Sequence, residues 1–387
     1  MKVKLGDILH IKHGYAFKGE YFTDENTGKL VLTPGNFSLQ GGFLPTKKFT
    51  KEENFPQEFV LKPGDLIVTM TDLSKEIDTI GYSALVPNDN LLYLHNQRIG
   101  LVTINDDNYD YAFIYWLMRS KHYQRSIANT SNGATVHHTS PDRIYKYQFD
   151  RISLAKQRRI ASILSAYDNL IENNNKRIRL LEQMAENLYK EWFVRFRFPG
   201  HEKAEFENGL PKGWKRAPLK TICEFERGKN ITASEMISGN VPVISAGVSP
   251  SGFHNKSNVL GASVTISSSG ANAGFISIHY EDIWAADCSF ISEESTKYLY
   301  YVYELLNNMR AVVDNLQRGA AQPHVYPKDL NRLSVIVPSE HIREKANERF
   351  YHLHQLMSKL LQQNTYLSRQ RDLLLPRLMS GKLEVKL

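Results

Sequence analysis

Residues that could do chemistry gather around two short motifs of similar sequence. The first is GATVHHTSP at residues 133–141, and the second is GAAQPHVYP at residues 319–327. Gly-Ala, His and Pro recur at one offset, because 319 − 133, 324 − 138 and 327 − 141 all equal 186. Their histidines can donate and accept hydrogen bonds, but they lack metal-ligand spacing with carboxylates. We therefore interpret the histidines as turn residues or phosphate contacts, with a purely structural role as the alternative.

Sequence motifs of the common catalytic sites are absent. The sequence has no Asn/Asp-Pro-Pro-aromatic tetrapeptide with a Gly-rich cofactor loop, as an adenine methyltransferase needs, and no GxxxxGK[ST] phosphate loop. The stretch SSSGANAG at residues 267–274 has a similar glycine content but no lysine, and no helix pattern follows it. We interpret it as a glycine-hinged loop that faces a nucleic acid or as a tight β-turn, with a nucleotide-binding site as the alternative. Cys223 and Cys288 form no CxxC pair, so we expect no zinc site and no disulfide framework.

The composition indicates a folded protein with more than one domain. The chain has 387 residues, which is too long for a single ordinary hydrophobic core. Of these residues, 42% are hydrophobic and 23% are charged, as in folded proteins. The chain has 48 Lys and Arg residues and 41 Asp and Glu residues, so its net charge is +7. This charge favours a protein that binds an anionic partner, and a basic enzyme with no such partner is the alternative. No apolar run is long enough to span a membrane, and the N-terminus lacks a signal-peptide core. We therefore expect a soluble protein of the reducing cytoplasm with no membrane partner.

The repeat extends beyond the two motifs. LGDILHIKHG at residues 5–14 corresponds to LKTICEFERG at residues 219–228, and the sequences between these openings and the motifs diverge. Short apolar runs bounded by Gly, Pro, Asn and Asp predict β-strands there. These runs cover residues 66–69, 82–86, 100–104, 241–244, 263–267 and 275–278. One helix is expected before each motif and one closing strand after it. A shared frame with a different middle is typical of two copies of one scaffold that bind different things.

A long amphipathic helix follows each copy. Apolar residues repeat every four and then three positions over more than four heptads, which predicts a coiled-coil seam. In the first helix the seam positions are Ile160, Leu164, Tyr167, Ile171, Asn174, Ile178, Leu181, Ala185, Leu188 and Trp192. In the second helix they are Ala346, Phe350, Leu353, Met357, Leu360, Asn364, Leu367, Arg371, Leu374 and Leu378.

Two asparagines in these seams favour antiparallel pairing of the helices. Asn174 takes a d position and Asn364 an a position, and a layers meet d layers in an antiparallel pair. We predict that the two asparagines face each other and set the register; two unrelated solvated asparagines are the alternative. We expect Arg371, the charged residue of the second seam, to extend its head group to solvent near the helix end.

Taken together, these features resemble one family, the DNA-specificity subunits of type I restriction–modification enzymes. The resemblance covers essentially the whole chain and is most specific at residues 157–193 and at residues 209–214 of the linker, within the stretch NGLPKGW. It implies an α+β chain with an internal pseudo-two-fold repeat, in which two similar globular target-recognition domains are separated by two long helices in an antiparallel coiled coil. The expected parts are target-recognition domain 1 at 1–152, long helix 1 at 153–197, a linker at 198–214, target-recognition domain 2 at 215–338 and long helix 2 at 339–387.

The resemblance also implies the function and the partners. Each domain would read one half of a bipartite, asymmetric site in double-stranded DNA, and the helices would space the domains and dock two modification (methyltransferase) subunits. Restriction subunits would bind that core in the full complex. This chain would carry no cofactor and no catalytic residue, and S-adenosylmethionine would bind the methyltransferase subunits. The second helix has Arg343 where the first has Gln157, so the two helices need not dock their partners identically.

Side chains that can read DNA are Arg or Lys for guanine, Asn or Gln for adenine, and further cations for phosphates, all on loops that reach a groove. The candidates in the first copy are Lys12, His13, Lys75, Asn132 and His138. The candidates in the second copy are Arg227, Lys229, Asn230, Asn272, Arg318, Gln322 and His324. Two other functions stay open at this point: a self-contained DNA methyltransferase or nuclease, and a coiled-coil adaptor without a DNA role.

Overall fold

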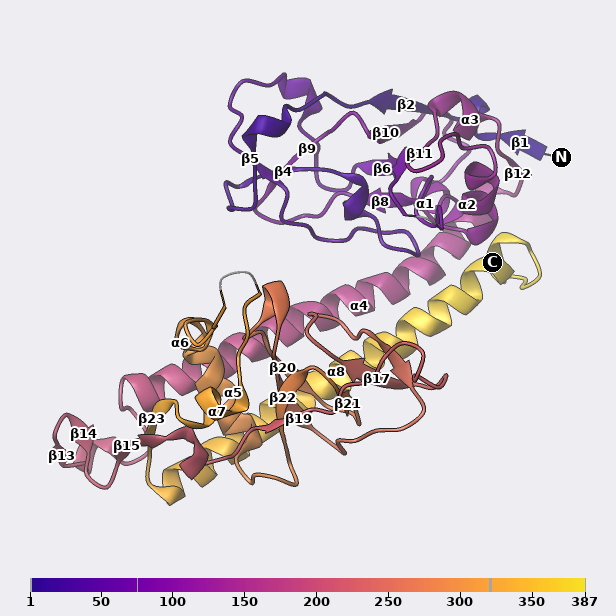
Figure 1. The fold of residues 1–387 in the computed structure, drawn as a ribbon. Helices are drawn as coiled ribbons and strands as arrows, with labels where there is room; N and C mark the ends of the chain where they lie inside the picture. Colours follow the sequence, from indigo (N-terminus) through magenta and orange to yellow (C-terminus); the bar gives the residue numbers. More distant parts are fainter. Residues whose placement is uncertain (1, 75, 320–321, 387) are drawn as a thin grey trace. The chain divides into compact units, whose positions relative to one another are not determined.

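The computed structural model describes residues 2–74, 76–319 and 322–386. The chain divides into two compact units: Met1–Glu172 with Thr365–Leu387, and Asn173–Asn364. We call them unit 1 and unit 2. Each unit contains one globular domain and a part of each of the two long helices, α4 (Leu154–Tyr189) and α8 (Glu340–Met379). Figure 1 labels the elements.

The domain of unit 1 is built on two four-stranded sheets and two strand pairs. The first sheet is antiparallel, with the order β2 (Leu9–His13), β10 (Ile99–Ile104), β6 (Leu66–Thr69) and β8 (Ser83–Leu85). The second has the order β3 (Phe22–Thr23), β5 (Phe49–Thr50), β4 (Lys29–Val31) and β9 (Leu92–Leu94), and β4 runs parallel to β9. The pairs are β1 (Lys2–Lys4) with β12 (Gln148–Asp150) and β7 (Thr71–Asp72) with β11 (His137–His138).

The domain of unit 2 repeats this plan. Its antiparallel sheet has the order β16 (Glu226–Arg227), β22 (Cys288–Ser292), β19 (Ser263–Ser267) and β20 (Ile276–His279). A second sheet has the order β18 (Gly252–His254), β17 (Val241–Ile244) and β21 (Trp284–Ala285), with β17 parallel to β21. The closing pair is β15 (Lys215–Pro218) with β23 (Ser334–Val337). The strands predicted from the apolar runs and the closing strands are confirmed.

Equivalent contacts in the two domains support the repeat. The backbone N–H of Ile11 donates to the hydroxyl of Tyr145 at 2.9 Å, and the backbone N–H of Phe225 donates to Oδ1 of Asn331 at 2.7 Å. Ile11 and Phe225 are 214 residues apart and Tyr145 and Asn331 are 186 apart, as the two sequence offsets require. A different side chain therefore anchors the opening strand to the motif helix in each copy.

The expectation of one helix before each motif is wrong, because each helix is broken. The first is split into α1 (Tyr111–Leu117) and α2 (Lys121–Ala128), and the second into α5 (Leu299–Asn308) and α6 (Arg310–Asp314). In the first pair, the hydroxyl of Ser120 accepts a hydrogen bond from the N–H of Tyr123 and so begins a new helix.

The long helices pack antiparallel within each unit. In unit 1, Leu164 of α4 shares a hydrophobic cluster with Leu375 and Leu378 of α8. In unit 2, Ile178 packs with Met357 and Leu360. The partner number falls as the α4 number rises, and all the predicted seam positions are buried or half-buried. The antiparallel prediction is confirmed, and a π-helical turn, Lys190–Val194, follows α4.

Arg371 does not extend to solvent as we expected. Its side chain is only 9% exposed, and it forms ion pairs with Asp168 of α4 at 2.5 Å and with Asp372 at 2.8 Å. Asp168 in turn pairs with Arg119, which is 3% exposed, at 2.6 Å. A carboxylate on the facing helix holds the arginine inside the seam, because an unpaired buried charge is costly.

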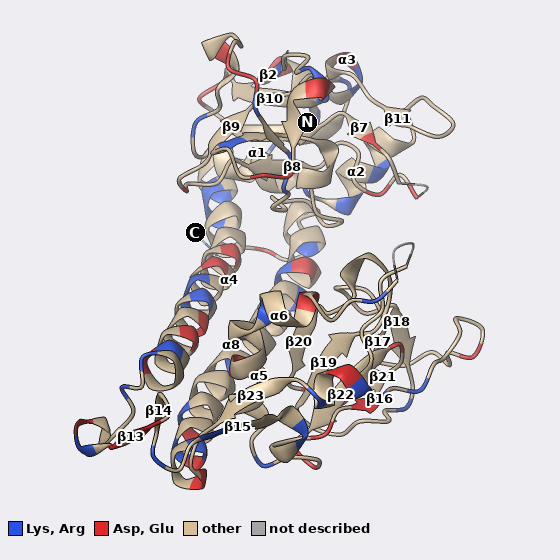
Figure 2. Cartoon of the chain, turned by 60° about the vertical axis from the view of Figure 1, so that its left-hand side comes forward, with Lys and Arg blue, Asp and Glu red and all other residues tan. Residues whose placement is uncertain are grey.

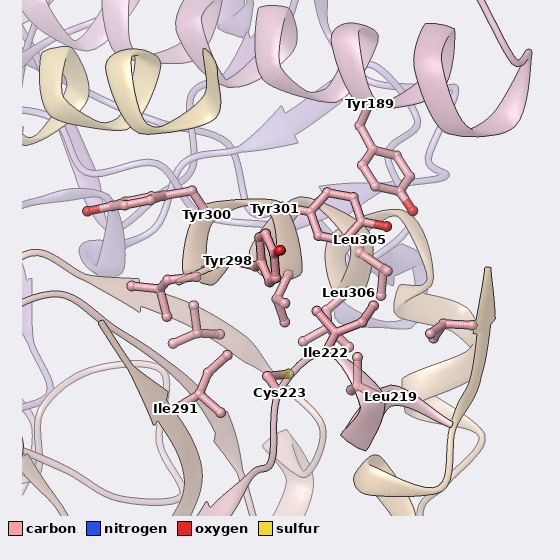
Figure 3. Close-up of a cluster of buried hydrophobic side chains, with 14 of the residues drawn as sticks. Tyr189, Leu219, Ile222, Cys223, Ile291, Tyr298, Tyr300, Tyr301, Leu305 and Leu306 are labelled. Carbon is pink, nitrogen blue, oxygen red and sulfur yellow. The ribbon is translucent and has the colours of Figure 1, made fainter. Parts of the chain in front are cut away.

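The core of unit 2 joins its domain to the long helices. Figure 3 shows Tyr298, Tyr301 and Leu305 of the α5 region beside Cys223, with Tyr189 of α4 above them. Trp214 and Phe198 belong to the same cluster, so the expected linker at 198–214 is anchored at both ends and carries the hairpin of β13 (Phe206–Glu207) and β14 (Leu210–Pro211). Burial raises the pKa of the Cys223 thiol to about 12, as suits a core residue.

Candidate nucleic-acid interface

Each motif forms a loop that is closed by a two-residue antiparallel bridge. In unit 1, Asn132 and His138 exchange backbone N–H···O hydrogen bonds of 3.0 and 2.8 Å. In unit 2, Arg318 and His324 exchange the same two bonds at 2.9 and 2.8 Å. These pairs are repeat equivalents at the offset of 186. Four of the predicted DNA-reading residues therefore lie at the bases of two equivalent loops.

The first glycine of each motif is required by the backbone of this loop. Gly133 has φ +120° and Gly319 has φ +97°, which are conformations that side chains with a Cβ rarely adopt. A Cβ on Gly133 would lie 1.9 Å from the carbonyl oxygen of Val136, and one on Gly319 would lie 2.7 Å from that of Gln322. The shared Gly is thus explained by the turn.

The rest of the motif fixes the loop to the sheet. The N–H of Thr139 donates to the carbonyl of Met70, and the N–H of Val325 donates to the carbonyl of Ser268, both at 3.0 Å. The shared proline then begins a short helix, α3 (Pro141–Tyr145) or α7 (Pro327–Asn331), where a missing N–H costs nothing. The repeated sequence is therefore a structural frame for a surface loop.

The opening strand of each domain ends at the same sheet edge as its loop. In unit 1, His13 pairs with Gly100, which also pairs with Val68 just before β7. In unit 2, Arg227 pairs with Ser289, which also pairs with Ile266 just before the Ser269–His324 bridge. Strand register therefore brings His13 to the edge that carries His138, and Arg227 to the edge that carries His324.

The other predicted DNA-reading residues have different surroundings. Lys12 pairs with Glu58 at 2.8 Å and lies over the Phe59 ring, so its charge is already partnered. Asn272 belongs to the short 3-10 helix Gly270–Asn272, next to the motif, because the N–H of Gly270 donates to the carbonyl of Pro323. Lys229, Asn230 and Gln322 are exposed, and Lys75 lies outside the described residues. That these residues contact DNA stays a prediction.

Sequence reasoning missed a carboxylate that shapes the loop at residues 72–80. Asp72 is 1% exposed, and its carboxylate accepts hydrogen bonds from Ser74, from the N–H and hydroxyl of Thr79, and from the N–H of Ile80. Burial alone would raise the pKa of Asp72, but these hydrogen bonds outweigh it and lower the pKa. Asp72 pairs with His137 in the β7–β11 bridge, so it anchors this loop beside the motif loop.

Electrostatics differ between the two sheet edges. In unit 2, Arg227 pairs with Asp287 at 2.9 Å and Arg318 pairs with Asp329 at 2.6 Å. Sequence reasoning also missed Lys328 and Arg332, two exposed cations that follow the motif in PKDLNR and that line a pocket with both arginines. Their signal was available, as two cations within five residues after the motif proline. The described residues of the site form an array of donors and cations on loops.

Within the described parts of the chain, no group of three or more His, Cys, Asp or Glu side chains could hold a metal ion. The described helices include none that is long and apolar enough to cross a membrane.

The model of the type I restriction modification DNA specificity domain matches residues 1–183 and again residues 211–363. The chain belongs to this DNA-specificity family. Because two matches cover most of the chain, each specificity domain corresponds to one copy of the repeat.

Two curated relatives and one crystal structure resemble this specificity chain. It is 24% identical over 336 residues to the type I restriction enzyme MjaIX specificity subunit of Methanocaldococcus jannaschii. The aligned region covers 79% of this chain and 76% of that protein. It is also 24% identical over 388 residues to a Mycoplasma pneumoniae protein named as a type I specificity subunit, over 97% and 95% of the two chains. The crystal structure of the S subunit from M. genitalium has the same fold, with a TM-score of 0.59 and 17% identity over 100% of this chain and 96% of that one.

Proposed function

We propose that this chain is the non-catalytic specificity subunit of a type I restriction–modification complex and that each domain reads one half of a bipartite DNA site. The observation that supports this most directly is the pair of equivalent loops, closed by Asn132–His138 and by Arg318–His324. The frame of the loops is shared, whereas the side chains that they present differ. Two domains of the same fold that present different hydrogen-bond donors and acceptors suit a DNA site whose two halves differ in sequence.

The long helices supply surfaces for two partner subunits. Leu170 and Leu356 are 50% and 49% exposed, and they are repeat equivalents, since 356 − 170 is 186. Leu180 and Tyr366 are 59% and 56% exposed and share the same offset. Charged residues of both signs alternate with uncharged ones along α4 (Figure 2). Apolar side chains that recur at equivalent exposed positions fit two copies of the same partner, which we take to be the methyltransferase subunit.

The chemistry then belongs to the partners. The methyltransferase subunits bind S-adenosylmethionine and modify adenine, and restriction subunits join the complex where the host encodes them. This chain acts in the cytoplasm with the DNA, and its own contribution is to bind and to select the sequence.

A domain exchange tests the proposal. Residues 1–150 are replaced by the corresponding residues of another family member, the hybrid is assembled with the methyltransferase subunits, and methylated adenines are mapped in genomic DNA. We expect one half of the recognition site to change and the other half to stay. A change of both halves would contradict the proposal that each domain reads one half of the site. Methylation by the purified chain alone, with DNA and S-adenosylmethionine, would contradict its non-catalytic role.

A further inference from the structure

A cationic pocket of about 450 Å³ lies beside the motif loop of unit 2. Tyr326 and Asp329 line it together with four cations, which come from the opening strand, from the position just before the motif and from the segment after the motif. These cations are Arg227, Arg318, Lys328 and Arg332. Elements that are distant in sequence thus converge on one concave, positively charged surface.

The carboxylates near the pocket neutralise only half of this charge. Asp329, 11% exposed, pairs with Arg318, and Asp287 pairs with Arg227. Within the part of the chain that the structure describes, the side chains of Lys328 and Arg332 have no hydrogen-bond or ion-pair partner. Two unpaired cations that share one concave surface repel each other and favour an anion between them.

The pocket is continuous with the loop that we assign to base reading. The ring of Tyr326 stacks on His324, with centroids 5.8 Å apart and an interplanar angle of 16°. His324 forms the base of the motif loop with Arg318, and Asp329 holds the Arg318 guanidinium through one of its nitrogens. The remaining N–H groups of Arg318 are therefore oriented while still available to a ligand.

The repeat shows that this charge is particular to unit 2. The unit 1 residues at the positions of Lys328 and Arg332 are Asp142 and Lys146, and Asn132 stands at the position of Arg318. His13 and Ser140 take the places of Arg227 and Tyr326. The frame is conserved between the two copies, but the cation cluster is not, so the frame itself does not require it.

We infer that this pocket binds a phosphate of the DNA backbone next to the bases read by unit 2, with Lys328 and Arg332 as the main phosphate contacts. The inference rests on the proposed DNA-binding function and adds to it an anion site whose cation cluster is not repeated at the equivalent positions of unit 1. Phosphate contacts fix register and orientation without reading sequence. The pocket therefore anchors the unit 2 loop on the duplex and contributes equally to target and non-target DNA.

The test compares the wild-type chain with a Lys328→Gln/Arg332→Gln double variant, each assembled with the methyltransferase subunits. Binding to a random-sequence duplex is measured between 50 and 200 mM salt. Loss of the one phosphate contact in this pocket makes the slope of log K against log salt less steep by about 0.9, so the loss of affinity between 50 and 200 mM salt becomes about 3.5-fold smaller in the double variant. Lys203→Gln, an exposed linker residue, is the matched control and leaves the slope unchanged.

The outcomes separate the pocket from the general function. If the wild-type complex shows no salt-dependent binding to duplex DNA, the proposed function fails. If the wild type binds and the double variant keeps its slope, the pocket inference alone is wrong. The inference is also wrong if the methylated sequence changes in the double variant, because a phosphate contact carries no sequence preference. Titration with adenosine monophosphate tests whether the pocket is a site for free nucleotides. If the double variant loses adenosine monophosphate binding but keeps the wild-type slope of log K against log salt for DNA, the pocket does not bind the DNA backbone.

Discussion

The side-chain amide of Asn174 donates a hydrogen bond to Oδ1 of Asn364 at 2.9 Å, across the seam between α4 and α8. The same amide donates to Gln363 at 3.0 Å, and Asn364 donates to Asn175 at 2.8 Å. Asn174 is 4% exposed, so its polar atoms depend on these partners. The predicted contact between the two asparagines is therefore present, and its role in setting the register stays a prediction.

An asymmetric change at this pair should destabilise the chain, and a symmetric one should not. Asn174→Leu leaves Oδ1 of Asn364 without the donor that it faces across the seam, and we expect a loss of about 1–2 kcal/mol in the free energy of unfolding. The double variant Asn174→Leu/Asn364→Leu adds a hydrophobic layer and should regain or exceed wild-type stability. Urea unfolding followed by far-UV circular dichroism measures both. A double variant as unstable as the single one would argue against the pairing.

The ion pairs around Asp168 lead to a second prediction. Asp168→Ala removes the carboxylate that Arg371 and Arg119 share, and we expect a loss of about 2–4 kcal/mol, reduced from the cost for a fully buried pair because Asp168 is 29% exposed and Arg371 keeps Asp372. Arg371→Leu should cost much less, since Asp168 keeps Arg119 and the seam gains an apolar side chain. Urea unfolding compares the free energies of unfolding of these two variants. Equal losses in both would contradict the shared role of Asp168 in the two ion pairs.

Alanine substitutions test whether DNA binding depends on the glycines of the motif loops. Gly133→Ala and Gly319→Ala should each weaken DNA binding by the methyltransferase-assembled complex, because the added Cβ would collide with a backbone carbonyl inside the loop. Gly209→Ala is the matched control: its φ is +76°, but a Cβ there would meet nothing within 4 Å, so it costs only about 1–2 kcal/mol of backbone strain. DNA affinity is measured by fluorescence anisotropy. Full affinity in both motif variants would show that the loops do not bind DNA.

The repeat frame was predictable from sequence because it depends on local chemistry. A left-handed turn needs glycine, a helix start accepts proline, and a strand between turn residues needs an apolar run; these requirements recur at offsets of 186 and 214. The a/d seam was predictable for the same reason, since its period depends only on helix geometry.

Long-range partners were not predictable. Arg371 was expected to reach solvent because nothing near it in sequence suggested Asp168, which lies 203 residues away. The break between α1 and α2 was missed because Ser120 in an apolar helical pattern does not by itself indicate a cap. Lys328 and Arg332 appeared as ordinary surface cations until the fold brought Arg227 from the opening strand to the same pocket.

A pH-dependent stability is expected at β20 of unit 2. Burial lowers the pKa of His279 to about 4, and its ring lies 2.9 Å from the Thr265 hydroxyl. Below the ordinary pKa of 6.5 the unfolded chain binds a proton that the folded chain does not, so the free energy of unfolding falls as the pH drops from about 6.5 to about 4, by about 3 kcal/mol in total. Protection factors of the β19 and β20 amides, from hydrogen exchange at pH 7 and pH 5, measure this locally.

His279→Gln removes the titrating group and should flatten this pH dependence, whereas exposed His341→Gln should leave it unchanged. An equal pH dependence in His279→Gln and the wild type would place its origin elsewhere.

The exposed apolar positions of the long helices predict the stoichiometry of partner docking. Leu170→Asp and Leu356→Asp each place a charge in one of two equivalent apolar surfaces, so each variant should bind one methyltransferase subunit fewer than the wild type, and the double variant should bind none. Native mass spectrometry of the assembled complexes counts the subunits. Leu39→Asp, at a 64% exposed position in the unit 1 domain, is the control that keeps both subunits. Two bound subunits in the double variant would contradict docking through these repeat-equivalent positions.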